Sequence, residues 1–264
     1  MQSYPCSDGY MKSESIGSKL KGMLRDMGIG VVGYAPVSAW DTDPLVSGRI
    51  DPVSRPASIM RNARSVIVIG IPISAATIDT APSIAYAEAY KVINTMLDQA
   101  TQRIAMELMA LGHDAMPIPR DGYHGIDGLR ESPSAFFSHR HAAYLAGLGT
   151  FGENNMLISA EYGSLIRYSS VLTDVVLPYD YPLNAEVCIH CGNCVRACPA
   201  GALTRGVYPE NITDKSKCID RSDELRVHGI SPCGMCIAAC PIGRPHSMKY
   251  QTPEALEKIR SYRR

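Results

Sequence analysis

Residues 188–199 read CIHCGNCVRACP, which separates four cysteines by two, two and three residues and ends on a proline. At this spacing one loop can offer three thiolates to a cubane 4Fe-4S cluster, while the following turn carries the fourth thiolate away. The stretch therefore predicts an iron–sulfur module in this part of the chain.

A second run, CGMCIAACP at residues 233–241, repeats three of these cysteines and the proline, and Cys218 supplies a fourth thiolate. In two-cluster modules of this type the last cysteine of each run ligates the other cluster. The first cluster is therefore expected on Cys188, Cys191, Cys194 and Cys240, and the second on Cys198, Cys218, Cys233 and Cys236.

Zinc is the alternative ligand, because paired CxxC motifs also bind zinc. A third cysteine two residues further on and a Cys-Pro ending are poor zinc spacing, so we favour iron–sulfur clusters. Cys6 lies in a segment, residues 1–12, that we predict to be disordered, and it is not needed as a ligand. His190 is expected to donate a hydrogen bond beside the first cluster rather than to ligate it.

Composition limits the remaining choices. The chain has 264 residues, 45% of them hydrophobic, which suits one main domain and a smaller module. Its 26 basic and 26 acidic residues cancel, so bulk charge does not point to nucleic acid or to an anionic membrane. We find no membrane span and no leader peptide, and eight of nine cysteines crowd together, so we expect a cytoplasmic metalloprotein with no membrane partner.

The apolar pattern predicts an α/β (α+β) domain over residues 1–182, a ferredoxin-like module over 183–245 and a helical tail over 246–264. Residues 66–69 are a β-branched run that is typical of a central strand, and 85–111 form the longest predicted helix. Further helices are expected at 13–27, 136–148 and 253–262, strands at 29–34, 115–118, 156–159 and 165–172, and a polar loop at 120–132.

A glycine-rich segment, AGLGTFGENN at residues 146–155, follows a predicted helix and precedes a strand, and a Tyr162-Gly163-Ser164 turn comes next. Glycines so close together indicate that something approaches the backbone closely, although single glycines also end helices and form turns. Their order is the reverse of a dinucleotide-binding fingerprint, so we expect no bound NAD.

The chain resembles the epoxyqueuosine reductases, and more distantly the reductive dehalogenases. The resemblance rests on AGLGTFGENNMLIS at 146–159, EYGS at 161–164, VLTD at 171–174, the cysteine module and, more weakly, the opening GVVGYAP at 30–36. It implies a nitroreductase-like domain that holds base-off cobalamin, with two clusters carrying electrons from a low-potential ferredoxin or flavodoxin. The corrin would then be lined by Gly147, Leu148, Gly149, Phe151, Gly152, Asn154, Asn155, Tyr162, Gly163, Ser164 and Arg167.

The sequence departs from these relatives at the proton donor. Epoxyqueuosine reductases carry an aspartate in a D-T-G-P stretch, where this chain has PSAF at residues 133–136. A replacement donor is expected among Tyr123, His124, Glu131, His139 and His141. Each of these residues could instead be an ordinary surface residue or a residue that packs in the core. The tRNA-gripping helical repeat of longer relatives is missing, so tRNA is not the favoured partner, although it stays open.

Three functions follow from these observations. The first is a cytosolic reductase that passes electrons through two clusters to cobalamin and acts on a small or unidentified substrate. The second is an electron-transfer or corrinoid-reducing partner without its own substrate. The third is the activity of one of the two resembled families. It is either epoxyqueuosine reduction in tRNA, with one of the replacement donors above as the acid, or reductive dehalogenase-like activity. The latter is suggested by Arg167 in YGSLIR, which resembles the Y-G-P-R-V-R turn of the dehalogenases, while no twin-arginine leader is found.

Overall fold

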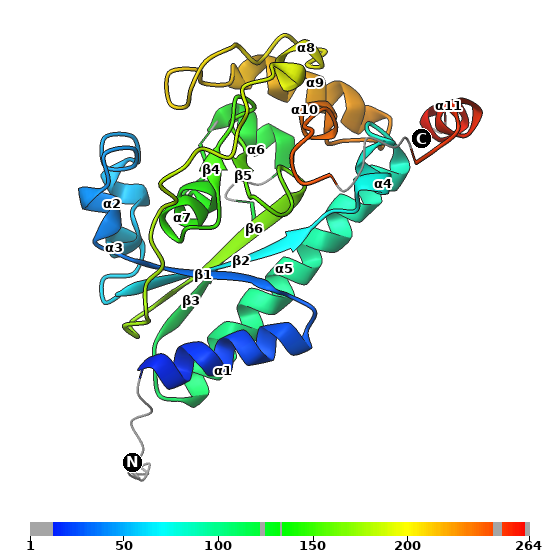
Figure 1. The fold of residues 1–264 in the computed structure, drawn as a ribbon. Helices are drawn as coiled ribbons and strands as arrows, with labels where there is room; N and C mark the ends of the chain where they lie inside the picture. The colour runs from blue at the N-terminus through cyan, green and yellow to red at the C-terminus, as the bar shows by residue number, and fades with distance from the viewer. Residues whose placement is uncertain (1–12, 122–124, 133, 245–249, 262–264) are drawn as a thin grey trace.

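The computed structural model describes residues 13–121, 125–132, 134–244 and 250–261 (Figure 1). Its centre is a four-stranded antiparallel sheet in the order β1-β2-β6-β3. The strands are β1 (Val31–Pro36), β2 (Ser65–Pro72), β6 (Ile166–Thr173) and β3 (Ala115–Ile118). The central position predicted for residues 66–69 is confirmed, because β2 lies between two neighbours.

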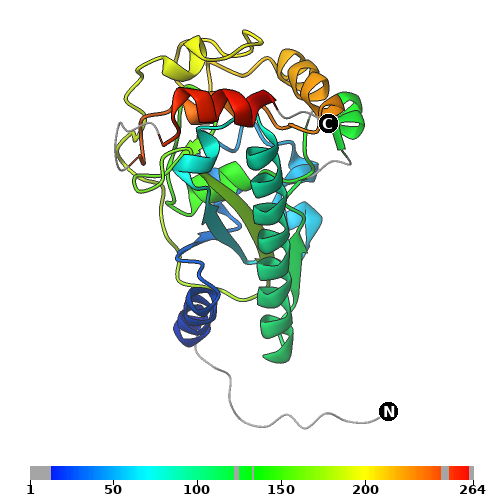
Figure 2. The ribbon, with the colours of Figure 1, turned by 90° about the vertical axis from the view of Figure 1, so that its right-hand side faces the viewer.

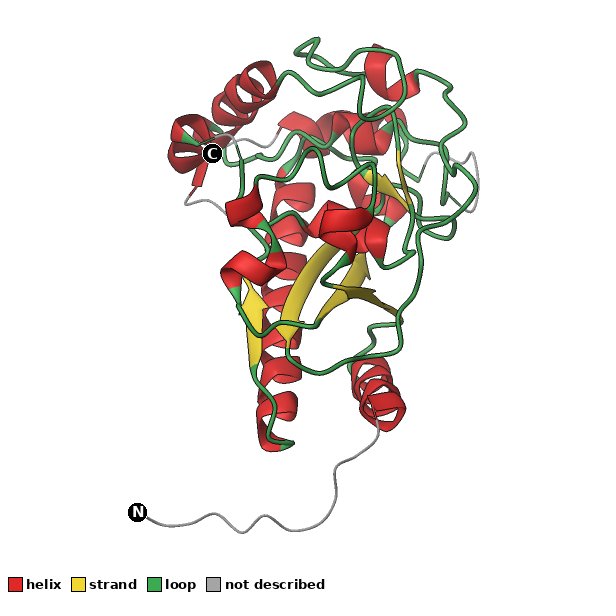
Figure 3. Cartoon of the chain, turned by 90° about the vertical axis from the view of Figure 1, so that its left-hand side faces the viewer, coloured by secondary structure: helices red, strands yellow, loops and turns green. Residues whose placement is uncertain are grey.

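The two faces of β2 are both covered. Ile67, Ile69 and Ile71 pack with helices α1 (Ser13–Asp26) and α5 (Ile84–Ala110), whereas Val66 and Val68 pack on the other side with α2 (Ala39–Thr42) and α7 (His139–Leu145). Successive side chains of a strand point to opposite faces, so an unbroken apolar run requires cover on both. The result is a three-layer α/β domain, seen from its two sides in Figures 2 and 3.

The remaining elements are short. The α/β domain adds η1 (Pro52–Ser54), α3 (Pro56–Ile59), α4 (Ala75–Ile78) and a small hairpin of β4 (Thr150–Phe151) with β5 (Leu157–Ile158). The cysteine module contributes α8 (Asn193–Arg196), α9 (Lys215–Val227) and α10 (Met235–Ala238), and α11 (Pro253–Ser261) lies across the end of α5 (Figure 2). The mixed α/β fold with an appended two-run cysteine module is confirmed. Within the described ranges, no helix is long and apolar enough to cross a bilayer.

The loop predicted at residues 120–132 is wrong in its second half, which forms helix α6 (Gly125–Glu131). Arg130 of this helix donates to Asp220 and Asp223 of α9, at 2.8 and 3.0 Å. A short polar helix has no apolar stripe, so the periodicity of the sequence cannot reveal it. In the structure, α6 packs against α9.

Glycine backbones join the cysteine module to the α/β domain. A Cβ atom at Gly163, whose φ is +56°, would collide with the carbonyl group of Ile242, and one at Gly243 would collide with Tyr162 and Gly163. At a second contact, a Cβ at Gly234 would lie 2.5 Å from the Tyr86 ring on α5. The module can sit this close to the domain only because these positions have no side chain.

We therefore expect Gly163→Ala to destabilise the anaerobically reconstituted protein by about 2–4 kcal/mol, through left-handed backbone strain and collision with Ile242. Gly22→Ala is the matched control, because Gly22 lies in α1 with nothing near its missing Cβ, and alanine there should be neutral or stabilising by up to about 1 kcal/mol. Urea unfolding measures both. Equal stability of the two variants would contradict the contact.

Candidate iron–sulfur site

The two cysteine runs are built alike. Gly192 and Gly234, with φ of +69° and +70°, each follow a cysteine and precede the short helices α8 and α10. A left-handed residue reverses the chain, and it costs a residue other than glycine about 1–2 kcal/mol. Each run thus folds as a tight loop around its own thiols, which the repeated CG-x-C pattern encodes.

The first three cysteines meet a cysteine from the second run. Cys188, Cys191, Cys194 and Cys240 line one cavity, together with apolar side chains that include Ile158, Ile189 and Ile242. The cavity lies under the β4–β5 hairpin. This grouping supports the proposal that Cys240 crosses over to the first cluster.

The other four cysteines form a second group. Burial raises the pKa values of Cys218 and Cys236, and the nearby thiols of Cys198 and Cys233 add to both shifts. Cys236 also interacts with Cys194, so the two groups are neighbours. Cys198 therefore lies with the second run, as the crossed assignment of ligands that we propose requires.

The chemistry of these thiols suits clusters. Burial raises the pKa of Cys194 to about 11 and that of Cys236 to about 12. Both thiols keep their protons in a metal-free chain, so iron must displace protons as it binds, and cluster uptake should be coupled to pH. Within the described ranges, no group of His, Cys, Asp or Glu is compact enough to hold a single metal ion, whereas a cubane spreads its four ligands around a larger body.

A buried carboxylate fixes the first loop. Glu153 is 2% exposed, accepts the backbone N–H of Gly192 at 3.0 Å and pairs with Arg205 at 2.7 Å. The Arg205 guanidinium also donates to the carbonyl of His190. The predicted role of His190 beside the first cluster stays a prediction, and its Nε2 atom lies 3.0 Å from Glu186.

The next two residues differ in what they contact. Asn155 donates to the carbonyl of Asn211 and accepts from the N–H of Thr213, so its amide ties the hairpin to the module. Asn154 uses only its Oδ1, which accepts from the N–H of Met156. Its Nδ2 is buried without a hydrogen-bond partner in the described part of the chain, and Asn154 lines the cavity of the first four cysteines.

The glycine-rich segment packs against the protein's own backbone. A Cβ at Gly147 would collide with the carbonyl of Tyr181, one at Gly149 with the carbonyl of Ile158 and one at Gly152 with the Ile158 side chain. These contacts explain the glycines whether or not a ligand is bound, so corrin lining by this segment stays a prediction. Ser164 adds one feature that suits a ligand, a buried Oγ that has no partner among the described residues.

The side chains predicted around the corrin point in different directions. Phe151 stacks on Tyr208 with ring centroids 4.0 Å apart, and Leu148 packs in the α7 layer of the core. Tyr162 joins the same cluster of apolar residues. Arg167 instead points to the α5 face, where Nε donates to Asn94 at 2.7 Å and the guanidinium lies over the Tyr90 ring. These contacts give Arg167 a packing role within the domain.

The predicted proton donors lie apart. Glu131 is exposed at the end of α6. His139 bonds to Ser170 and Pro119, His141 bonds to Ser138 and Tyr208, and burial lowers their pKa values to about 4 and about 3. Both rings are neutral at physiological pH, with every ring nitrogen engaged, so neither is a ready acid. Tyr123, His124 and Cys6 lie outside the described residues.

Tyr208 is a functional candidate that the sequence analysis missed. Its hydroxyl lies 2.9 Å from Nε2 of His141, and its ring contacts Phe151. Burial raises the pKa of this phenol, which therefore keeps its proton at physiological pH. Sixty-seven residues separate Tyr208 from His141, and no local motif links them.

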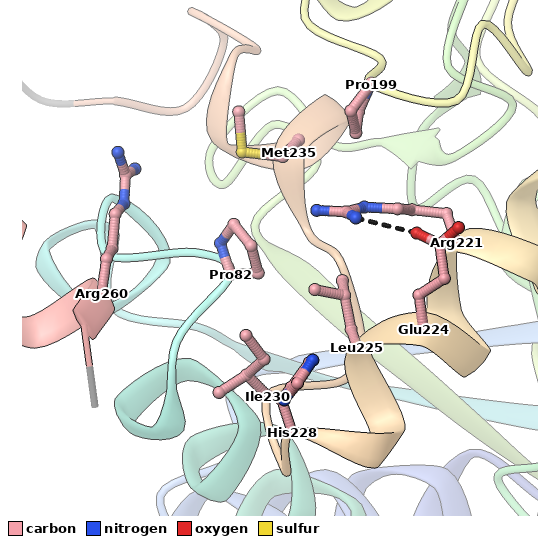
Figure 4. A pocket seen from close by; sticks show the side chains of 9 residues that line it. All are labelled: Pro82, Pro199, Arg221, Glu224, Leu225, His228, Ile230, Met235 and Arg260. Carbon is pink, nitrogen blue, oxygen red and sulfur yellow. Dashed lines mark hydrogen bonds and ion pairs between the residues drawn. The ribbon is translucent and has the colours of Figure 1, made fainter. Parts of the chain in front are cut away.

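A second cavity of about 520 Å³ is lined by residues of α9 and α10 together with Pro82, Pro199 and Arg260 (Figure 4). Pro199 and Met235, from the two cysteine runs, form one wall, and Leu225 and Ile230 form an apolar floor. Arg221 points into the cavity and pairs with Glu224 at 2.9 Å. This cavity lies beside the second group of cysteines.

The crossed assignment predicts the outcome of two double substitutions. Cys198→Ala with Cys218→Ala should remove ligands of one cluster only and leave about half the parent's iron and sulfide after anaerobic reconstitution, whereas Cys198→Ala with Cys188→Ala should damage both clusters. Cys6→Ala should leave the full content. If each run instead held its own cluster, the two double variants would exchange results.

Comparisons with known proteins agree with this geometry. Residues 181–204 and 233–251 each match a family described as a 4Fe-4S binding domain, so the chain carries 4Fe-4S clusters. An epoxyqueuosine reductase from Cyclobacterium marinum is 37% identical over 86 residues, which are 33% of this chain and 26% of that protein. The matches cover 20–27% of the length of the first curated relatives.

Two groups of solved structures share the fold. An epoxyqueuosine reductase with an epoxyqueuosine-modified tRNA stem loop aligns at a TM-score of 0.57 and 18% identity, over 91% of this chain and 70% of that one. A reductive dehalogenase, whose structure is described with a mechanism for B12-dependent dehalogenation, aligns at a TM-score of 0.65 and 17% identity. The alignment covers 97% of this chain and 37% of that one. A tetrachloroethene reductive dehalogenase from Dehalobacter restrictus is 30% identical over 150 residues, which are 56% of this chain and 25% of that protein. The chain is thus similar to both the epoxyqueuosine reductases and the reductive dehalogenases, in sequence and in fold.

Proposed function

We propose that this protein is a reductase that passes electrons, one at a time, from an external low-potential donor through two 4Fe-4S clusters to a base-off cobalamin. The observation that carries the proposal is the seating of the cysteine module. Its first group of thiols lies under the hairpin formed by the glycine-rich segment, at the edge of an α/β domain. The B12-dependent dehalogenase, whose fold aligns with 97% of this chain, supports the choice of cofactor.

The residues present suit this cofactor in part. The buried, unpartnered Ser164 Oγ could take up an amide of the corrin periphery, and the Tyr162-Gly163-Ser164 turn lies against the loop that follows Cys240. When bound, cobalamin would supply a strongly reducing metal centre. The chain's own part is to bring a cluster near that centre and to exclude water from it.

A proton must accompany the electrons in most reductions of organic substrates. In place of the aspartate of the relatives, we propose the Tyr208 hydroxyl as the group that holds this proton. Its raised pKa keeps the phenol protonated, and His141, held neutral by burial, positions the hydroxyl through a hydrogen bond of 2.9 Å.

The charges around Tyr208 favour a substrate with an anionic group. Arg49 and Arg140 act electrostatically on both Tyr208 and His141, and Arg140 also acts on Lys215. Two cationic side chains, Arg49 and Arg140, thus act on one phenol in a chain whose overall charge is zero, and Lys215 lies near Arg140. Such a local field raises the concentration of anionic ligands near the hydroxyl.

Titration of the anaerobically reconstituted protein with cob(II)alamin tests the cofactor. We expect the EPR spectrum of the corrinoid to change from the base-on to the base-off form on binding, at roughly one corrinoid per chain. A spectrum that stays base-on at saturating protein would contradict the proposal. If that protein nevertheless reduced an added corrinoid protein, the result would favour the second function, an electron-transfer partner without a substrate of its own, over the cobalamin-dependent reductase.

Epoxyqueuosine in tRNA is the second candidate substrate, because Arg49, Arg140 and Lys215 could contact phosphates. On this candidate, expression of the chain in a bacterium that lacks epoxyqueuosine reductase restores queuosine in tRNA, and Arg140→Gln with Lys215→Gln lowers the yield severalfold. Arg226→Gln, an exposed arginine of α9, serves as the control for loss of charge. Nucleoside analysis of bulk tRNA gives the answer, and absence of queuosine excludes the candidate.

A further inference from the structure

The cavity lined by Cys188, Cys191, Cys194 and Cys240 is also lined by an asparagine, one polar group of which has no hydrogen-bond partner among the described residues. This group is Nδ2 of Asn154, in a side chain that is 4% exposed. An unpaired amide N–H buried away from water costs free energy, so it is retained where something else accepts its hydrogen bond. The other side chains that line the cavity are cysteines, apolar residues and Glu153, whose carboxylate is already bound.

The orientation of the Asn154 amide is fixed by its other end. Oδ1 accepts the backbone N–H of Met156 at 3.1 Å, within the turn between β4 and β5. An amide whose oxygen is held in this way cannot exchange its oxygen and nitrogen without losing that bond. Nδ2 must therefore remain the free end.

A backbone N–H donor of the first cysteine loop is already used by another group and cannot serve the cavity. The N–H of Gly192, between Cys191 and Cys194, donates to Glu153. It is consequently not free to donate to a cluster sulfur. A side-chain donor from the hairpin is thus the natural replacement for a backbone donor from the loop.

We propose that Asn154 donates an N–H···S hydrogen bond to the first cluster or to one of its thiolates, and that this bond raises the reduction potential of that cluster. Hydrogen bonds to the sulfurs stabilise the more negative, reduced form of an iron–sulfur cluster. Asn154 is a positioning and tuning residue that ligates no iron. The proposal rests on the clusters and on their crossed ligands but not on cobalamin.

The test compares redox titrations of reconstituted proteins, followed by EPR. Asn154→Leu, similar in size, neutral and without a donor, should shift one of the two midpoint potentials to more negative values and leave the other unchanged. Asn154→Asp, which keeps Oδ1 but loses the N–H₂ group and adds a negative charge, should shift the same potential further. Asn62→Leu is the control, because Asn62 is exposed, its amide donates to Asp114, and it lies in neither the cluster cavity nor the junction with the module. It should leave both potentials in place.

Each outcome decides the proposal. An unchanged potential in Asn154→Leu, with iron and sulfide at the parent level, would overturn it whatever the aspartate variant does. Failure of both variants to assemble the first cluster would also overturn it, because Asn154 would then be a structural requirement of the loop. A shift as large in Asn62→Leu would also overturn it, because the effect would then not depend on a hydrogen bond in the cavity. Since the cob(II)alamin titration measures a different event, failure of the cofactor proposal would leave this result standing.

Discussion

The contact between the backbones of Gly163 and Gly243 determines where the iron–sulfur module sits on the α/β domain. One glycine belongs to the turn before β6, and the other follows the last cysteine of the second run. Because Cys240 lies only three residues before Gly243, the contact also brings this thiol toward the β4–β5 hairpin. A side chain at either position would push the loop outward and separate Cys240 from the first three thiols.

Several polar groups of the β4–β5 hairpin are paired with groups of the cysteine module. Asn155 bonds to Asn211 and Thr213, Thr150 accepts the N–H of Val187, and Glu153 joins the loop of the first cluster. Buried polar groups add little net stability when they are paired, but each costs about 1–3 kcal/mol when its partner is displaced. These hydrogen bonds therefore favour a single placement of the module on the domain over shifted ones.

Much of the fold could be predicted because the decisive signals are local. The spacing of the cysteines, the apolar run of β2 and the period of α5 each lie within about 30 residues. The pairing of Tyr208 with His141 could not be predicted, since it depends on how two distant segments pack. The glycines at 147, 149 and 152 gave a correct indication of close approach, but the approaching atoms include backbone of the same chain, at Tyr181 and Ile158. A sequence cannot distinguish such a contact from contact with a ligand.

The environment of the first cluster combines groups with opposing effects. Glu153 brings a negative charge next to thiolates that are themselves negative, and its partner Arg205 is 56% exposed. Water and salt screen the exposed cation more than they screen the buried carboxylate, so Arg205 offsets the charge of Glu153 only in part. A negative charge at this position would disfavour an added electron and lower the reduction potential of a cluster bound in the cavity. Asn154, whose N–H opposes this effect locally, would keep the cluster within reach of its donor.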